Sequence, residues 1–156
     1  MMMKLSCEVI SRLKGQTLVT AESCTGGGIG AALTAIPGSS EVYKGGIISY
    51  TNEIKEKMLG VAPQLLVREG AVSEAVAKAM ATGAREKLCA DVAVSISGLA
   101  GPGGDEYGNP VGTVYIGYAD ERGVRSREYH FSGDRDAVRS QAVCAALEFI
   151  LQEIDA

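Results

Sequence analysis

The sequence contains only one histidine, His130, and this scarcity excludes several classes of active site. A metal centre built from several imidazoles is not available, and a Ser-His-Asp triad would have to use His130 itself. The cysteines form no Cys-x-x-Cys pair, which argues against a structural zinc site and against a redox dithiol. We expect a domain without a metal site and with four free thiols, at Cys7, Cys24, Cys89 and Cys144.

Long hydrophobic runs and basic clusters are missing as well. No apolar run approaches the roughly 20 residues that a bilayer-spanning helix needs. Residues Met1 to Glu8 lack the apolar stretch of a secretion signal, so a cytoplasmic location is expected. The chain has 15 Lys and Arg against 19 Asp and Glu, which gives a net charge of −4. It has no basic cluster that would bind the phosphate backbone of a nucleic acid. Neither nucleic acid nor a membrane is therefore expected as a partner.

The residues that are present suit one globular domain. Hydrophobic residues make up 46% of the 156 positions and charged residues 22%, so a sizeable core can form. No repeat, low-complexity tract or linker divides the chain, and we expect residues 1–156 to form a single domain. The 20 glycines exceed the average usage of about 7% and occur in clusters, which is where functional loops are to be sought.

Hydrophobic periodicity predicts helices that alternate with strands. Strands are predicted over residues 17–21, 47–50, 91–97, 113–119 and 124–131. Helices are predicted around residues 5–13, after the first strand, between the second and third strands and after the last strand, with Asn52, Ser73 and Asp134 as N-caps and Pro63 in a first turn. This alternation, followed by a late pair of strands, predicts an α/β fold, a three-layer α/β/α sandwich around a mixed, mostly parallel sheet.

Residues 17–33 have the order strand, glycine-rich turn, helix. The N–H groups at such a helix start are free to bind an anion or a developing oxyanion, and the glycines from Gly26 to Gly28 allow close backbone approach to a ligand. Glycines that serve only packing are the plainer interpretation. The run Gly26-x-Gly28-x-x-Ala31 also fits the dinucleotide-binding fingerprint, but the chain is too short for a six-strand nucleotide fold with a substrate region.

Ser23 lies at this strand-to-helix turn, where the following amides can stabilise charge on an attacked carbonyl oxygen. Its hydroxyl needs a base, and since His130 is far along the chain, lysine is the remaining residue type. Lys55, in the short helix after the second predicted strand, can serve if burial lowers its pKa from about 10.4. Tyr50, which closes that predicted strand, can bridge Ser23 and Lys55 by hydrogen bonds. By spacing alone, a solvated helix lysine is the better interpretation of Lys55.

Two other nucleophiles are conceivable from the sequence. Ser11-x-x-Lys14 matches the Ser-x-x-Lys signature of acyl-transfer enzymes, but it lies in the first predicted helix with no glycine loop nearby. Cys24 is adjacent to Ser23 and would point the other way from a strand end. Both are weaker candidates than Ser23.

Ordered blocks of residues resemble the CinA C-terminal domain family and cover essentially the whole chain. The blocks are Thr20 to Gly27 (TAESCTGG), Gly38 to Ser40 (GSS), Gly46 to Lys55 (GIISYTNEIK), Ser95 to Gly104 (SISGLAGPGG), Pro110 to Val114 (PVGTV) and Phe131 to Arg135 (FSGDR). Many CinA proteins also carry a larger N-terminal domain. The present chain resembles the stand-alone form.

The resemblance implies an activity and a catalytic set. Members of the family are known as nicotinamide-nucleotide amidohydrolases, which convert nicotinamide mononucleotide and water to nicotinate mononucleotide and ammonia in pyridine-nucleotide (NAD) salvage. It implies Ser23 as nucleophile, Lys55 as base and Tyr50 as an assisting residue, with no metal and no cofactor. The alternative is a non-catalytic nucleotide-binding or interaction module, in keeping with the competence and DNA-damage context of the family name.

The remaining site residues are expected from the chemistry of this substrate. The amides of Thr25, Gly26 and Gly27 are expected to hold the oxyanion. The phosphate needs donors, which we expect in the loop from Gly98 to Gly104, including Gly101, and in Arg135 at a helix start, although a solvated Arg135 is an alternative. The expected partners are the small-molecule substrate and a second copy of the chain in a homodimer.

Overall fold

The structure is a computed structural model that describes residues 1–156. Its elements are, in chain order, α1 (Met2–Arg12), β1 (Leu18–Glu22), α2 (Gly28–Thr34), the 3-10 helix η1 (Ser39–Glu41), β2 (Tyr43–Ile48), α3 (Asn52–Leu59), α4 (Pro63–Glu69), α5 (Glu74–Lys87), β3 (Val92–Gly98), β4 (Thr113–Asp120), β5 (Gly123–His130) and α6 (Arg135–Ile154). None of these helices is long and apolar enough to cross a bilayer.

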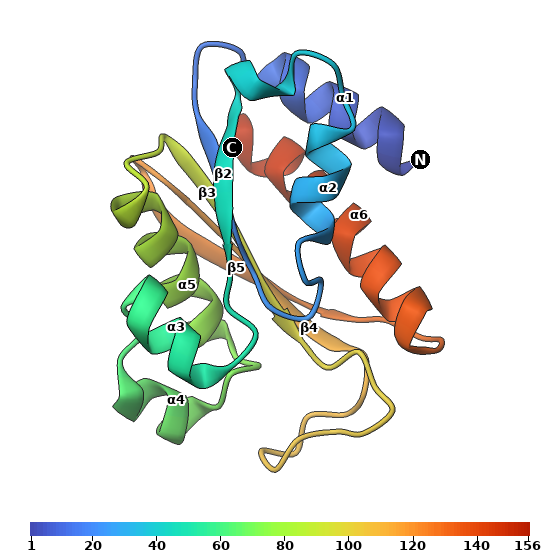
Figure 1. Cartoon of the computed structure of the whole chain (residues 1–156). Coiled ribbons are helices and arrows are strands. Elements are labelled where there is room, and N and C mark those ends of the chain that lie inside the picture. The colour runs from blue at the N-terminus through green and yellow to red at the C-terminus, as the bar shows by residue number, and fades with distance from the viewer.

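The five strands form one mixed sheet in the order β2-β1-β3-β4-β5. Strand β1 pairs in parallel with both β2 and β3, whereas β4 is antiparallel to β3 and β5. Four of the five strands therefore share one direction. Helices α1, α2 and α6 lie on one side of the sheet, and α3, α4 and α5 lie on the other (Figure 1). The predicted α/β/α sandwich around a mixed, mostly parallel sheet is confirmed.

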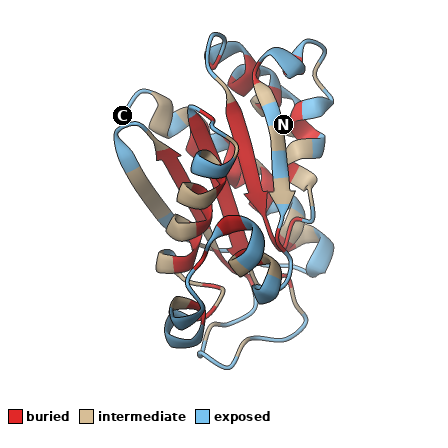
Figure 2. Cartoon of the chain, turned by 60° about the vertical axis from the view of Figure 1, so that its left-hand side comes forward, coloured by how far each residue is buried: buried red, intermediate tan, exposed pale blue.

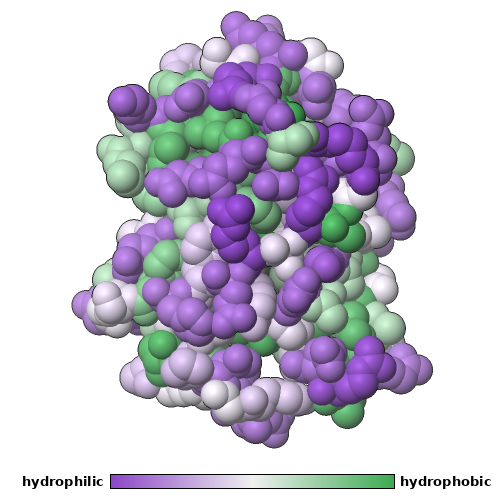
Figure 3. All heavy atoms as spheres, turned by 180° about the vertical axis from the view of Figure 1, so that it is seen from behind, coloured by the Kyte–Doolittle hydropathy of each residue, from purple (hydrophilic) through white to green (hydrophobic).

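The core lies on both faces of the central strands. Every residue of β1 is buried, and so are the first six residues of β3, as expected for strands covered by helices on both sides (Figure 2). A cluster of 24 buried hydrophobic residues fills the side of α1, α2 and α6, and a cluster of 12 fills the side of α5. Strand β5 has no buried residue. The back of the molecule is mostly hydrophilic, with apolar groups in the upper part of the view and smaller ones toward its right and lower edges (Figure 3).

The segment that leads to Lys55 differs from its sequence prediction. Strand β2 begins at Tyr43 and ends at Ile48, so Tyr50 lies beyond the strand. The predicted strand starts at Ile47 and misses the first four of the six residues of β2, because glycines such as Gly45 and Gly46 usually interrupt strands. Gly46 nevertheless lies inside β2, where a Cβ would collide with Thr20 Oγ1. Thr51, not Asn52, caps α3 by accepting a hydrogen bond from the Ile54 amide at 3.3 Å.

The helix signals predicted at Pro63, Ser73 and Asp134 are confirmed, and Gly60 provides a further helix end. Gly60 ends α3 in a left-handed conformation, Pro63 is the first residue of α4, and the side chains of Ser73 and Asp134 cap α5 and α6. Helix α3 is held against α5 at Gly83, where any Cβ would collide with the carbonyl oxygen of Leu59. This close approach of two helices fixes the element that carries Lys55.

Candidate active site

A cavity of about 300 Å³ opens at the carboxyl ends of β1 and β3. Its walls come from the turn after β1, the segment between β2 and α3, the first turn of α3, the loop before α5, the end of β3 with the loop after it, and the start of α6. In α/β sheets this edge is the usual position of a ligand site. Of the residues predicted for the site, the cavity is lined by Ser23, Tyr50, Lys55, Gly98, Gly101 and Arg135.

Ser23 is the first residue after β1 and is held in line with the sheet. Its N–H donates to the carbonyl oxygen of Ile96 on β3 at 3.1 Å, which continues the parallel pairing by one residue. The side chain is 6% exposed, and its Oγ lies 3.0 Å from the Nζ atom of Lys55. The structure therefore brings together two predicted residues that are 32 positions apart in the sequence.

Lys55 is almost completely buried, with 1% of its surface exposed. Besides Ser23, its Nζ atom faces the carbonyl oxygens of Ser49 at 2.7 Å and Tyr50 at 3.4 Å, and it forms no ion pair with a carboxylate. Burial lowers the pKa of Lys55 from 10.5 to about 8, because desolvation disfavours the ammonium. At this pKa, about a tenth of the amine is neutral at pH 7.

The three oxygens around Lys55 Nζ can accept from its ammonium, and the same geometry also suits the neutral amine. A neutral amine has two N–H donors and one lone pair. Its donors can bind the carbonyl oxygens of Ser49 and Tyr50, and its lone pair is then left for the hydroxyl proton of Ser23. The arrangement can therefore remove a proton from Ser23, which is what a serine nucleophile requires.

Tyr50 and Arg135 meet at the rim of the cavity. The Tyr50 hydroxyl accepts a hydrogen bond from Arg135 Nη2 at 3.1 Å, and Arg135 Nη1 donates to the carbonyl oxygen of Gly101 at 2.6 Å. Tyr50 is 59% exposed, and only its backbone carbonyl reaches Lys55. The structure does not place the phenol between Ser23 and Lys55, because Tyr50 lies two residues beyond the end of β2 and its ring extends toward α6. An assisting role for the phenol stays a prediction.

Thr25, Gly26 and Gly27 do not line the cavity, although they were expected to bind the substrate. The Thr25 hydroxyl donates to the carboxylate of Glu22 at 2.6 Å. Gly26 and Gly27 both have positive φ, and a Cβ on Gly27 would press on Ile48. These residues shape the turn, and the cavity lies on the side of Ser23 and Cys24.

Glu22 is a buried residue of this site that sequence reasoning missed. Its Oε1 accepts the N–H of Ile29 and its Oε2 accepts the N–H of Gly30, both at 2.9 Å. The prediction that the start of α2 offers free amides to an anion is therefore wrong for these two groups, and a pyrophosphate there would meet a carboxylate. The available signal was an acidic residue six positions before α2, a helix whose N-cap is a glycine, because the helix dipole favours a carboxylate near this end.

The alternative nucleophiles are poorly placed. Ser11 and Lys14 are exposed and lie outside the cavity. Cys24 lines the cavity, but burial raises the pKa of its thiol to about 11, so the reactive thiolate is scarce at neutral pH.

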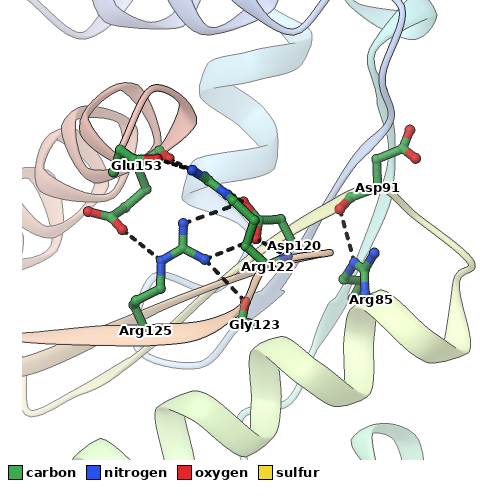
Figure 4. Close-up of polar contacts among 8 residues, drawn as sticks. Arg85, Asp91, Asp120, Arg122, Gly123, Arg125 and Glu153 are labelled. Atoms are coloured by element: carbon green, nitrogen blue, oxygen red, sulfur yellow. Dashed lines mark hydrogen bonds and ion pairs between the residues drawn. The ribbon is translucent and has the colours of Figure 1, made fainter.

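A second polar cavity, of about 340 Å³, lies at the opposite end of the sheet. Its charged groups bind one another: Asp120 is paired with Arg122 at 2.8 Å and Arg125 at 2.9 Å, and Arg125 also binds Glu153 on α6 at 2.8 Å (Figure 4). Although burial acts against ionisation, hydrogen bonds from Arg125 and Arg122 lower the pKa of Asp120 to about 2. We interpret this network as a structural link between β4, β5 and α6.

Comparisons with known proteins agree on one family. A family model described as the CinA C-terminal domain matches residues 3–154. A CinA-like protein of Thermosynechococcus vestitus is 52% identical over 152 residues, which cover 94% of this chain and 36% of the relative. A CinA-like protein of Geobacter sulfurreducens is 46% identical over 143 residues, which cover 92% and 35%. The chain thus spans about a third of the length of these curated relatives.

Solved structures match over nearly their whole length. A competence-damaged protein (CinA) superfamily protein from Escherichia coli has a TM-score of 0.95 at 40% identity, with 97% of this chain and 90% of that chain covered. The competence damage-inducible protein A from Klebsiella pneumoniae has a TM-score of 0.96 at 35% identity, with 99% and 97% covered.

Proposed function

The chain belongs to the CinA C-terminal domain family, and we propose that it hydrolyses the carboxamide of nicotinamide mononucleotide to give nicotinate mononucleotide and ammonia. The reaction is the one that the family resemblance implies. The observation that carries the proposal is the buried contact of 3.0 Å between Ser23 Oγ and Lys55 Nζ at the wall of a cavity.

The proposed mechanism has two half-reactions. Ser23 Oγ attacks the carboxamide carbon while neutral Lys55 takes the hydroxyl proton, which gives a tetrahedral oxyanion. The oxyanion collapses, the C–N bond breaks, and Lys55 returns the proton to the leaving nitrogen, so that ammonia departs. Lys55 then removes a proton from water, and the hydroxide attacks the acyl-serine ester to form a second tetrahedral intermediate. Its collapse breaks the C–O bond to Ser23, Lys55 returns the proton to Ser23 Oγ, and the carboxylic acid leaves and ionises to the carboxylate.

The two free amides next to Ser23 are suited to the oxyanion. The N–H groups of Cys24 and Thr25 form no hydrogen bond within the protein, whereas the next amide, of Gly26, donates to the Ser23 carbonyl at 3.0 Å. Unpaired amides beside a nucleophile are the usual donors to a tetrahedral intermediate. Of the amides predicted for this role, only that of Thr25 is retained in the proposal, and that of Cys24 is added.

Arg135 is the proposed partner of the substrate phosphate. It is exposed at the rim of the cavity, and its guanidinium binds two neutral oxygens, the Tyr50 hydroxyl and the Gly101 carbonyl, instead of a carboxylate. A phosphate dianion is a stronger acceptor than either oxygen and can replace them. Gly98 and Gly101 form the adjacent wall.

The direct test is to incubate the purified chain with nicotinamide mononucleotide and to measure ammonia and nicotinate mononucleotide together. We expect both products in equal amounts. Binding of the nucleotide, seen as a rise in the melting temperature, without either product would contradict hydrolysis. That result would favour the alternative, a non-catalytic nucleotide-binding module.

The activity should depend on pH through Lys55. Its pKa of about 8 lies below the ordinary value, so the neutral base is lost as the pH falls and is gained as the pH rises. We expect kcat/KM to rise about tenfold per pH unit below neutrality and to level off above about pH 8 to 9. A pH–rate profile from pH 6 to pH 10 measures this. A profile that is flat or falls across this range would contradict a neutral lysine base.

A further inference from the structure

The turn that carries the nucleophile is held from α6 by Arg139. Its Nε donates to the carbonyl oxygen of Cys24 at 3.0 Å, and its Nη2 donates to the carbonyl oxygen of Thr25 at 3.2 Å. Arg139 forms no ion pair. The half-buried guanidinium of Arg139, 114 residues from Thr25 in the sequence, thus binds the carbonyl oxygens of two consecutive residues in one turn.

These two contacts set the direction of the neighbouring N–H groups. In a trans peptide, the C=O and the following N–H point in opposite directions. Because the Cys24 carbonyl points toward Arg139, the Thr25 N–H points away from it, and this N–H is one of the two without a partner. The Thr25 carbonyl also points toward Arg139, and the next N–H, of Gly26, binds the Ser23 carbonyl at 3.0 Å.

The cavity and the hollow lined by Arg139 contact different residues of the turn. Cys24 lines the cavity with Ser23, whereas Arg139 lines a separate surface hollow with Thr25 and Gly28. The turn is also anchored by the Glu22 carboxylate, which binds the Thr25 hydroxyl at 2.6 Å. With the Cys24 carbonyl held by Arg139, the free Thr25 N–H is directed away from α6.

We infer that Arg139 is a positioning residue that holds the Cys24–Thr25 peptide so that its free N–H serves the oxyanion formed at Ser23. The inference rests on the proposed use of Ser23 as an acyl-transfer nucleophile. Arg139 does not touch the substrate. It acts through the backbone, because preorganised donors stabilise a developing charge without having to rotate during the reaction.

This role affects the transition state more than the bound substrate. The carboxamide oxygen of the ground state is neutral, and only the tetrahedral intermediate carries a full negative charge there. Loss of Arg139 should therefore lower kcat and leave KM nearly unchanged. A side chain that merely joins α6 to the turn would lower the melting temperature without changing kcat.

The test compares Arg139→Lys and Arg139→Met with a control, Arg12→Met, on the exposed end of α1. Lysine keeps the charge but lacks the planar fork that reaches two carbonyls. We expect kcat to fall about 10- to 100-fold in both Arg139 variants, with KM within about twofold, because small displacements of oxyanion donors have effects of this size. Arg12→Met should behave as the wild type.

A second readout does not depend on the substrate. Diisopropyl fluorophosphate labels an activated serine: Ser23 Oγ forms a bond to phosphorus, fluoride leaves, and Lys55 takes the hydroxyl proton. The phosphoryl oxygen in this step uses the same donors as a carbonyl oxyanion. We expect the labelling rate of Ser23, followed by intact mass, to fall with kcat in the Arg139 variants.

The outcomes separate this inference from the proposed function. Slower labelling in Arg139→Lys at an unchanged melting temperature supports the inference. A wild type that is labelled but does not hydrolyse nicotinamide mononucleotide refutes only the proposed substrate. The inference about Arg139 would be overturned if both the labelling rate and kcat were unchanged in the Arg139 variants, or if only KM rose. It would also be overturned if Ser23 of the wild type were not labelled. If Arg139→Met unfolds, Arg139→Lys decides.

Discussion

Replacing Ser23 by Ala is expected to abolish ammonia release from nicotinamide mononucleotide, with a fall in kcat of about 10⁴-fold or more. The physical reason is that no other activated nucleophile lines the cavity, since the Cys24 thiol has its pKa raised to about 11 by burial. The fold should persist because the Ser23 hydroxyl has one protein partner, Lys55 Nζ. Circular dichroism and the melting temperature check the fold, and a sensitive ammonia assay measures the activity.

Two serine and cysteine variants serve as controls for this result. Ser11→Ala removes the serine of the competing Ser-x-x-Lys motif, which is exposed on α1, and should leave kcat unchanged. Cys24→Ala tests the adjacent thiol and should retain most of the activity. Substantial turnover by Ser23→Ala, or its loss in Ser11→Ala or Cys24→Ala with Ser23 intact, would refute the assignment of the nucleophile.

Most of the fold is predictable from the sequence, because helix caps and hydrophobic patterns depend on interactions between residues that are close together in the chain. The apolar run of residues 91–97 became the buried β3, and Ser73 and Asp134 cap helices as short-range hydrogen bonding requires. The error at β2 has a physical cause. Glycines normally interrupt strands, and only the packing of Thr20 on the neighbouring strand shows why a glycine is needed at position 46 inside β2.

The candidate site was predictable where it follows from residue type and not where it depends on tertiary contacts. The serine at the strand end and the need for a base led to Ser23 and Lys55, yet nothing local shows that Lys55 is 1% exposed. The contacts of Glu22 with α2 and of Arg139 with the turn depend on how the elements pack. The same applies to Tyr50, whose partner on α6 is 85 residues away.

Replacing Lys55 by Met is expected to lower kcat by about 10³- to 10⁴-fold and, at the same time, to make the protein more stable at pH 7. The loss of activity follows from removal of the base. The gain follows from burial, because the pKa of Lys55 drops from 10.5 to about 8 and the folded state therefore bears the cost of a buried ammonium below pH 8. That cost is about 3 kcal/mol, and the loss of hydrogen bonds to Ser49 and Tyr50 offsets part of it.

The sign of this effect gives the variant a specific dependence on pH. Between about pH 8 and 10.5, the unfolded chain keeps the Lys55 proton while the folded chain has released it, so the stability of the wild type rises with pH. The advantage of Lys55→Met should therefore shrink by about 1.4 kcal/mol per pH unit in this range. Urea unfolding at pH 7, 8, 9 and 10 measures this change in the free energy of unfolding.

Lys57→Met, two residues further along α3 and exposed, is the matched control and should show neither effect. If the advantage of Lys55→Met is the same at pH 7 and pH 10, or if the variant keeps its turnover, the buried amine is not the base that activates Ser23.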